Sequence, residues 1–427
     1  MLSALMNSLT SVPRSLKYDQ NQRRALPAQL RPREDYSIWE IIKPNIGKDF
    51  SRFSVPVFLN EPLCFLQRLS EFMDYVDLIE IAASKDDPVE RISYIGAFTV
   101  AALSSNWNRL SKPFNPLLLE TFEVERNGVR FIAEQVSHHP PISAIHVEGK
   151  NFSIEATVSP KMSLGINKLI CTPEGGFELT LHNRNEVYTY MAPACTIYNV
   201  MMGKMYMNLT GHLNVNCVQT GLSINLSVDA GRGWHVKSTD VHIDGYIEKG
   251  KTKLRAIYGN WSYFLASCPV ETFKLNHSSY IKFFMTSLQP GNENMAPLLS
   301  DSKVLWTANQ LVSNYEKNFF FTPFVLSLNE LTDELRKKLP PTDSRFRPDI
   351  VALENGLCDR AESAKHALEE SQRSRRKQGV GNEPLWFKFD GKKWKYSGKY
   401  FDRDWTDCTD IFDNNVSDVI NNHSSKQ

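Results

Sequence analysis

The sequence has no long hydrophobic run and almost no net charge. None of its apolar stretches approaches the roughly 18 residues of a transmembrane helix, and residues 1–20 lack the charged and apolar segments of a signal peptide. The net charge of +1 over 427 residues argues against binding to bulk nucleic acid, which needs a basic stripe, but leaves room for a local basic pocket. We therefore expect a cytosolic protein without a membrane-spanning segment.

Cysteine pairs and catalytic signatures are also missing. The seven cysteines are widely spaced, odd in number and without a CxxC, so reduced cytosolic thiols fit better than disulfides or a zinc site. No GxSxG elbow and no paired carboxylates stand out. The residues therefore indicate neither hydrolase nor metal chemistry.

One stretch does match an enzyme motif. Gly245–Thr252 satisfies the phosphate-loop pattern GxxxxGK(S/T), whose mechanism needs a strand before it and a helix after it. Here Leu254–Tyr258 follows, ends at Gly259 and has the pattern of a returning strand. The stretch is therefore predicted to be a charged hairpin tip.

The apolar pattern changes along the chain. Apolar residues recur at intervals of three and four over residues 61–110, which predicts helices. Residues 116–330 show short alternating segments with turn residues roughly every 8–12 positions, which is typical of a meandering antiparallel sheet with enough strands to close a barrel. Residues 267–302 are expected to form a long loop, and Phe319–Leu328 the last strand. A polar helix is expected over residues 346–378.

Two adjacent histidines mark the most distinctive stretch, Glu134–Ala144. Pro140 and Pro141 follow them, fix φ and remove two backbone donors, so His139 is expected in a stiff, non-helical loop. Paired imidazoles in such a loop can donate hydrogen bonds to an anion at a small ordering cost. A turn with solvated histidines is the alternative, and the lack of a Cys or carboxylate ligand pattern disfavours a metal.

Two further groups are ambiguous by themselves. Lys365, Glu369 and Arg373 are spaced i, i+4 and i+8, so they lie along one side of a helix, where a solvated salt-bridge ladder is the ordinary interpretation. Lys112–Pro116 has the pattern of a proline-bracketed turn.

The run EQVSHHPP, Glu134–Pro141, resembles the fingerprint of the oxysterol-binding-protein-related family of lipid carriers. The resemblance covers roughly residues 36–412 and points in particular to the short-form subgroup of oxysterol-binding-protein-related proteins one and two. Other family-like blocks occur in chain order on either side of it, at Asn60–Arg68, Lys112–Leu118, Ser327–Leu331 and Leu339–Arg345.

This resemblance implies a mainly β, α+β fold: a large incomplete antiparallel β-barrel that encloses a lipid tunnel. Residues 35–412 would be one lipid-binding domain. Its expected parts are a mobile N-terminal arm (1–34), a lid segment (35–60), a helical layer (61–115), the barrel with its long loop (116–330, loop 267–302) and a C-terminal subdomain (331–427).

The resemblance also implies where lipids bind. Lys365 and Arg373 would meet the phosphate oxygens of a phosphoinositide, and Glu369 would accept hydrogen bonds from inositol hydroxyls. The implied head-group residues are Lys112, Asn115, His138, His139, Lys365, Glu369 and Arg373. The residues implied for sterol and lid are Trp39, Ile42 and Asn106.

The sequence departs from the family pattern at three positions. Asn106 precedes Trp107 where the family has a Gln near the tunnel floor, so sterol preference rests on a shorter amide. Leu119 stands where the family usually has a Gly before Glu120, and its larger side chain is expected to narrow the entrance of the lipid tunnel. Asn260 replaces a common Lys and removes a cation near bound lipid.

The implied function is lipid transfer. One tunnel would hold a sterol or a phosphoinositide, either phosphatidylinositol 4-phosphate or a bisphosphate, and exchange them between membranes at contact sites without cofactor or catalysis. The alternative is a phosphoinositide or sterol sensor or scaffold without net transport. A phosphate-loop or metal hydrolase is a third class, which an assay for nucleotide hydrolysis would separate.

A receptor partner is implied by one further segment. Glu71–Asp77 resembles the acidic two-phenylalanine motif that recruits receptors of the endoplasmic reticulum. That motif is read from an extended, exposed segment, whereas the period of three and four places Phe72 on the apolar face of a helix. The core-helix interpretation is therefore preferred.

Overall fold

The computed structural model describes residues 23–29, 40, 43, 55–228, 241–287, 298–309, 311–379 and 383–412. Most of the expected arm and lid, including Trp39 and Ile42, lies outside these residues. Within them, no helix is both long enough and apolar enough to cross a membrane.

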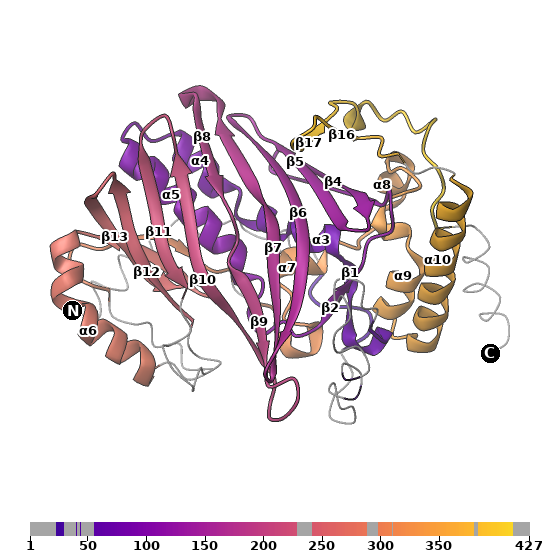
Figure 1. Cartoon of the computed structure of the whole chain (residues 1–427), viewed down its shortest axis with the longest axis horizontal. Helices are drawn as coiled ribbons and strands as arrows, with labels where there is room; N and C mark the ends of the chain where they lie inside the picture. Colours follow the sequence, from indigo (N-terminus) through magenta and orange to yellow (C-terminus); the bar gives the residue numbers. More distant parts are fainter. Residues whose placement is uncertain are drawn as a thin grey trace.

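One curved antiparallel sheet of 13 strands forms the body of the molecule (Figure 1). The strands follow one another in chain order, except that β9 pairs with both β7 and β10. The outermost strands, β3 and β15, are not neighbours, so the sheet is an open barrel. Its strands are β3 (Thr121–Arg126), β4 (Val129–His138), β5 (Pro141–Glu148), β6 (Phe152–Gly165), β7 (Lys168–Leu181), β8 (Glu186–Tyr190), β9 (Ala194–Tyr198), β10 (Tyr206–Cys217), β11 (Leu222–Val228), β12 (His242–Lys249), β13 (Thr252–Asn260), β14 (Phe264–Cys268) and β15 (Lys303–Thr307).

The alternating sequence pattern explains why these strands form. In β6, Phe152, Ile154, Ala156 and Val158 are buried while the residues between them are partly exposed. A period of two buries one face of each strand and leaves the other towards solvent, as expected for antiparallel strands that cover a core on one side.

A helical layer covers the buried face of the sheet. It contains α3 (Phe65–Leu69), the 3-10 helix η4 (Ser70–Tyr75), α4 (Asp77–Ala83) and α5 (Pro88–Ser104). The Asp87 carboxylate caps α5 by accepting from the Val89 N–H at 3.0 Å, and Pro88 occupies the first turn. Gly96 permits close packing, because a Cβ there would lie 2.5 Å from the Ile224 side chain of β11.

The ends of the expected helical layer, 61–115, are strands instead. Its first residues belong to β1 (Asn60–Cys64) and its last to β2 (Lys112–Phe114), which pair in parallel. The short, proline-containing segments lacked a clear period of two, so their pairing could not be read locally. This pair matters because Lys112, a predicted head-group residue, begins β2.

The segment that resembles a receptor-recruiting motif is part of the core. Residues 70–75 form η4 and all six are buried. Glu71 accepts from Arg109 at 2.6 Å, and Asp74 lies 3.0 Å from Arg126. Both acidic side chains are therefore committed to internal ion pairs, which supports the core interpretation over a receptor-recruiting role.

Two segments were assigned wrongly from the sequence. The expected loop 267–302 contains α6 (Val270–Ser287), because Val270, Phe273 and Tyr280 are buried on one side of a helix. The Phe273 ring packs 5.8 Å from Tyr246 of the neighbouring sheet. The expected last strand at 319–328 instead contains α7 (Pro323–Leu326), which Thr322 caps.

The C-terminal part packs against the β3–β6 end of the sheet (Figure 1). The positive φ of +77° at Gly356 separates two helices within the helix expected over 346–378. The elements are α8 (Asp333–Lys338), α9 (Pro348–Glu354), α10 (Cys358–Gln378), β16 (Phe387–Phe389) and β17 (Trp394–Tyr396).

Candidate functional site

The paired histidines lie at the tip of the β4–β5 hairpin. His138 is the last residue of β4 and pairs with Pro141, so His139 and Pro140 form the connecting turn. The register shifts between Gln135 and Ser137, which bends the strand before its end. Gln135 spans this bulge: its amide donates to the Ser137 carbonyl at 2.8 Å and its oxygen accepts from Ser143 Oγ at 2.6 Å.

Gln372 of α10 connects this hairpin tip to the rest of the protein. The Leu118 N–H donates to Gln372 Oε1 at 2.7 Å, and Gln372 Nε2 lies 2.8 Å from His138 Nε2. A backbone N–H can only donate, so the amide oxygen faces Leu118 and the NH₂ group donates to the imidazole. His138 Nε2 must therefore be an acceptor, which places the ring proton on Nδ1.

His138 is accordingly a neutral donor. Burial lowers its pKa to about 4, and the charges of His139 and Arg376 act in the same direction. Its buried Nδ1 makes no hydrogen bond of full geometry within the protein, although the nearby Pro116 carbonyl acts on the ring and partly offsets the lowering of the pKa. At neutral pH, His138 therefore offers an N–H donor without a charge.

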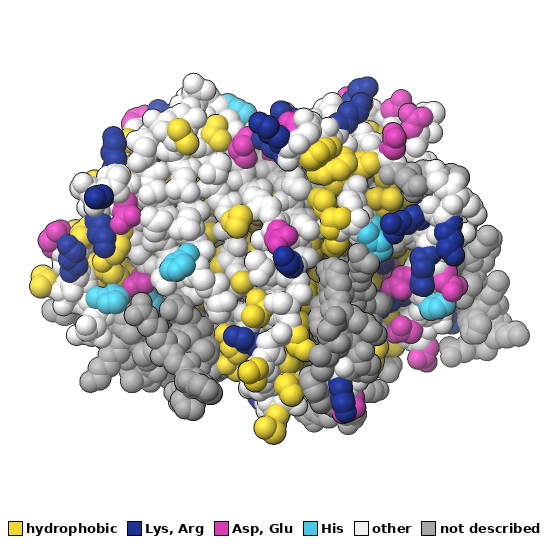
Figure 2. Space-filling model, viewed as in Figure 1, with side chains coloured by type: hydrophobic (Ala, Val, Ile, Leu, Met, Phe, Trp, Pro, Cys, Tyr) yellow, Lys and Arg dark blue, Asp and Glu magenta, His cyan; other side chains and the backbone are white. Residues whose placement is uncertain are grey.

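A small cleft of about 50 Å³, open to solvent, lies between the hairpin tip and α10. The His138 and His139 rings are 4.5 Å apart at its wall. Figure 2 shows histidine beside lysine and arginine side chains over this part of the surface. The cleft is lined by Leu118, His138, His139, Gln372, Arg373, Arg375 and Arg376.

A second cationic group adjoins the cleft. Lys112 Nζ donates to Asn115 Oδ1 at 2.5 Å, and Lys365 Nζ donates to the Val55 carbonyl. Removal from water and the nearby charge of Lys365 lower the pKa of Lys112 to about 8, and burial lowers the pKa of Lys365. Two ammonium groups whose surroundings disfavour their charged forms, with the charge of one acting on the other, are the arrangement expected of an anion site.

Glu369 links the two groups. Its charge acts on both Lys112 and Lys365, and its carboxylate lies 3.7 Å from Arg373 one helical turn further along α10. Of the seven predicted head-group residues, the cleft is lined by His138, His139 and Arg373, and the other four lie in the neighbouring group that Glu369 connects to Arg373. Lys365 is buried whereas Arg373 is exposed, so the site residues on α10 extend from the interior of the protein to its surface.

Arg347 supports this region from beneath and was missed by the sequence reasoning. It is buried, lies 2.8 Å from Glu120 and 2.6 Å from Asp349, and donates to the Asn115 carbonyl at 2.9 Å. Its charge lowers the pKa of both lysines. It therefore holds the Asn115 turn in place, while its own charge is balanced by Glu120 and Asp349.

The residues predicted for sterol and lid are elsewhere or outside the described chain. Asn106 Oδ1 accepts from Arg68 at 2.9 Å, and its NH₂ donates to the Leu103 carbonyl at 3.1 Å. Its amide thus has protein partners. Trp39 and Ile42 lie outside the described residues, so the lid assignment stays a prediction.

The two other departures from the family pattern have local explanations. Leu119 adopts a left-handed φ of +69°, a conformation that favours glycine and costs about 1 kcal/mol for other residues. Its buried side chain packs in a small cluster with Leu117 and Leu368, which offsets that cost. Asn260 closes the β13–β14 turn, where its Oδ1 accepts from the Ser262 N–H at 2.8 Å.

The alternative chemistries find no support in the described chain. Gly245–Thr252 spans the end of β12 and the start of β13, with Lys249 paired to Thr252, so the predicted hairpin is confirmed. A strand follows where a phosphate loop needs a helix. Among the residues that the structure describes, no group of His, Cys, Asp and Glu is arranged to hold a metal ion.

The chain belongs to the oxysterol-binding protein family, whose family model matches residues 37–405. It is 38% identical over 421 residues to oxysterol-binding protein-related protein 1 of Rattus norvegicus, covering 91% of this chain and 44% of that protein. It is also 38% identical over 426 residues to oxysterol-binding protein-related protein 2 of Homo sapiens, covering 92% of this chain and 88% of that protein. The chain thus spans less than half of the first relative and most of the second.

Solved structures confirm the predicted fold. The crystal structure of the Osh3 ORD in complex with PI(4)P from Saccharomyces cerevisiae has a TM-score of 0.76 and 30% identity, covering 92% of this chain and 99% of that one. The Osh1 ORD domain in complex with cholesterol has a TM-score of 0.77 and 29% identity, covering 96% and 98%. The family and the incomplete barrel expected from EQVSHHPP are therefore confirmed.

Proposed function

We propose that this chain is a lipid-transfer protein that takes up either a sterol or a phosphoinositide and exchanges them between membranes. The observation that supports the proposal is the arginine-lined cleft at the paired histidines, with Lys112 and Lys365 on neighbouring elements, in a fold whose relatives were solved with PI(4)P and with cholesterol. Binding and release involve no covalent step. The protein would act in the cytosol, in transient contact with membranes and their contact sites.

A phosphorylated inositol fits the chemistry of the site. The side chains of Lys112, Lys365 and Arg373 carry positive charge. His138 supplies an N–H donor that is already in position, and Glu369 can accept hydrogen bonds from inositol hydroxyls. Charge-assisted hydrogen bonds offset the cost of removing the phosphate from water. The negative charge of the phosphate also reduces the repulsion between Lys112 and Lys365. A free phosphate group in the ligand is therefore required, whether on a mono- or a bisphosphorylated head group.

The exchange is tested by competition and by transfer. Mass spectrometry of co-purified lipid should find sterol or phosphoinositide, and adding phosphoinositide to sterol-loaded protein should release about one sterol for each phosphoinositide bound. Vesicle-to-vesicle assays should show each lipid moving faster when the other is present on the opposite vesicles. A ternary complex with both lipids bound contradicts a shared tunnel, and binding without transfer favours a sensor or scaffold.

Raising the pH above about 8 is expected to weaken phosphoinositide binding. The Lys112 pKa of about 8 means that its ammonium is lost as the pH rises through that value, whereas an ordinary lysine stays charged to about pH 10. Bound phosphate favours the charged form of Lys112, so the affinity should be flat below pH 8 and fall above it, with Lys112 alone contributing at most about tenfold per pH unit. Equilibrium binding of a soluble head-group analogue from about pH 7 to 9.5 measures this.

Lys112→Arg is the matched control for the pH profile. Its guanidinium stays charged throughout, so the decline should be shallower, with a remaining slope from Lys365, whose pKa is also lowered. Identical profiles for the two proteins would show that Lys112 does not meet the phosphate.

A further inference from the structure

The hairpin of β6 and β7 projects beyond the neighbouring strands. β5 pairs only with residues 153–158 of β6, so from Ser159 onward β6 is paired with β7 alone. On the other side, β9 pairs with β7 over residues 168–171. The outer half of this hairpin, together with the β9–β10 loop, therefore stands at one end of the sheet as a protrusion.

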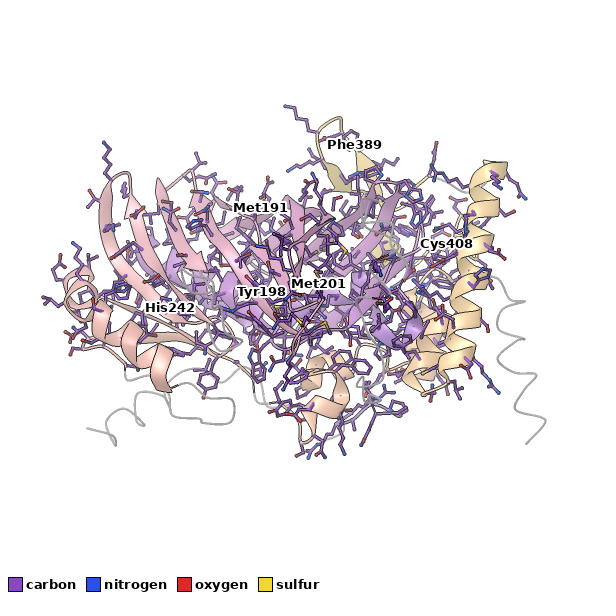
Figure 3. The ribbon with its side chains drawn as sticks, turned by 60° about the horizontal axis from the view of Figure 1, so that its bottom comes forward. Met191, Tyr198, Met201, His242, Phe389 and Cys408 are labelled. Atoms are coloured by element: carbon purple, nitrogen blue, oxygen red, sulfur yellow. The ribbon has the colours of Figure 1, made fainter. Side chains whose placement is uncertain are left out.

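The end of this protrusion exposes large apolar side chains. Ile166 is 94% exposed, Met202 is 81% exposed and Met201 is 45% exposed. We call these three residues the apolar tip. Figure 2 shows hydrophobic side chains at the lowest point of the molecule, and Figure 3 places Met201 close to Tyr198 where that end is turned forward.

The apolar tip is held in shape by Asn167. Its Oδ1 accepts from the Met201 N–H at 2.8 Å and from the Met202 N–H at 3.2 Å, and its amide donates to the Met202 carbonyl at 3.3 Å. These bonds tie the β6–β7 turn to the β9–β10 loop. The apolar side chains are thus presented to solvent on an ordered backbone instead of folding back onto the sheet.

Charge and aromatic residues surround the apolar tip. Lys168 and the exposed Lys204 flank it, and the Tyr198 and Tyr206 rings stack 4.9 Å apart just behind it. Apolar side chains at the front, with lysines and tyrosines behind, match the layers of a bilayer surface: acyl chains, anionic head groups and the interfacial region.

We propose that the apolar tip inserts into the surface of a bilayer that contains anionic phospholipid and so docks the protein for lipid exchange. The inference rests on the proposed transfer function, because a carrier must contact the membrane that supplies its ligand. A second copy of the chain is a poorer occupant, since three convex side chains offer far less than the roughly 800 Å² per partner of a stable protein interface.

The position of the tip relative to the candidate site supports this role. Cys171 lies on β7, three residues beyond Lys168, and Lys112 is near enough for its charge to offset part of the rise that burial causes in the pKa of this thiol. The hairpin therefore leads from the apolar tip towards the Lys112 side of the site. Docking through the tip would bring that side near the membrane surface.

The test compares a tip variant with a matched control. Ile166→Ser combined with Met202→Ser should lower co-sedimentation with vesicles of phosphatidylcholine and phosphatidylserine, free of phosphoinositide, by roughly tenfold. Val218→Ser changes an equally apolar residue, 86% exposed just beyond the other end of β10, and should bind like the wild type. Lys168→Glu with Lys204→Glu should weaken binding to these vesicles more than to vesicles of phosphatidylcholine alone.

A ligand-binding assay separates this proposal from the proposed function. Binding of a fluorescent sterol presented without vesicles should be unchanged in the tip variant, while transfer between vesicles slows. Wild-type protein that does not sediment with the vesicles, or a tip variant that sediments equally well, overturns docking by the tip. Wild-type protein that sediments but transfers neither lipid overturns the transfer function and leaves tip docking supported.

Discussion

Replacing both His138 and His139 by alanine is expected to abolish phosphoinositide extraction from vesicles while sterol binding stays near the wild-type level. The substitution removes the buried Nδ1–H of His138 and the neighbouring imidazole at the wall of the cationic cleft. Hydrogen bonds to charged groups contribute about 1.5–3 kcal/mol each, so losing two should weaken phosphoinositide binding by roughly 100-fold or more. A sterol has no phosphate for these groups to meet.

The measurement is lipid extraction by the double variant, with sterol and phosphoinositide assayed in parallel. His212→Ala, which removes an exposed imidazole on β10, is the matched control and should leave both activities unchanged. Gln372→Leu should give an intermediate loss, because His138 keeps its ring but loses the donor that fixes its tautomer. Equal extraction by the double variant and the wild type would show that the head group binds elsewhere.

Most of the sheet could be predicted from the sequence because each antiparallel strand shows a local alternation of apolar and polar residues. Alternation in segments such as Phe152–Val158 reflects one buried face, and turn residues mark each hairpin. The segment of α6 was assigned wrongly because its polar composition was weighed above the spacing of Val270, Phe273 and Tyr280. Those few apolar residues suffice when the sheet supplies the other half of the contact.

The candidate site was predicted only where the fingerprint or helical spacing named its residues. Gln372 joins Leu118 and His138, which are 254 and 234 residues away along the chain. No local pattern encodes that contact, although Gln372 follows Lys365 by seven residues and so shares its helix face. Arg347 was missed for the same reason, since its partner Glu120 is 227 residues away.

Glu134→Ala is expected to lower the free energy of unfolding by roughly 3 kcal/mol or more, because it leaves buried donors unpaired. Glu134 is 1% exposed, and its carboxyl group accepts from three backbone N–H groups, those of Leu385 at 2.9 Å, Trp386 at 3.0 Å and Phe387 at 3.2 Å. Glu134 of β4 therefore binds the backbone of residues 385–387, at the start of β16. The first residue of EQVSHHPP thus has a structural role, four positions before the histidine that faces the cleft.

Glu178→Ala is the matched control, because it removes a carboxylate that contacts the same β16–β17 hairpin at the protein surface. Glu178 accepts from Lys393 at 3.0 Å, but both side chains are more than a third exposed, so the loss should stay below about 1 kcal/mol. Chemical denaturation gives the two stabilities, and hydrogen exchange at residues 385–387 should accelerate only in Glu134→Ala. If both variants lose the same small amount and exchange is unchanged, the three N–H groups do not depend on Glu134. The fingerprint glutamate would then have to act on the ligand side of the hairpin.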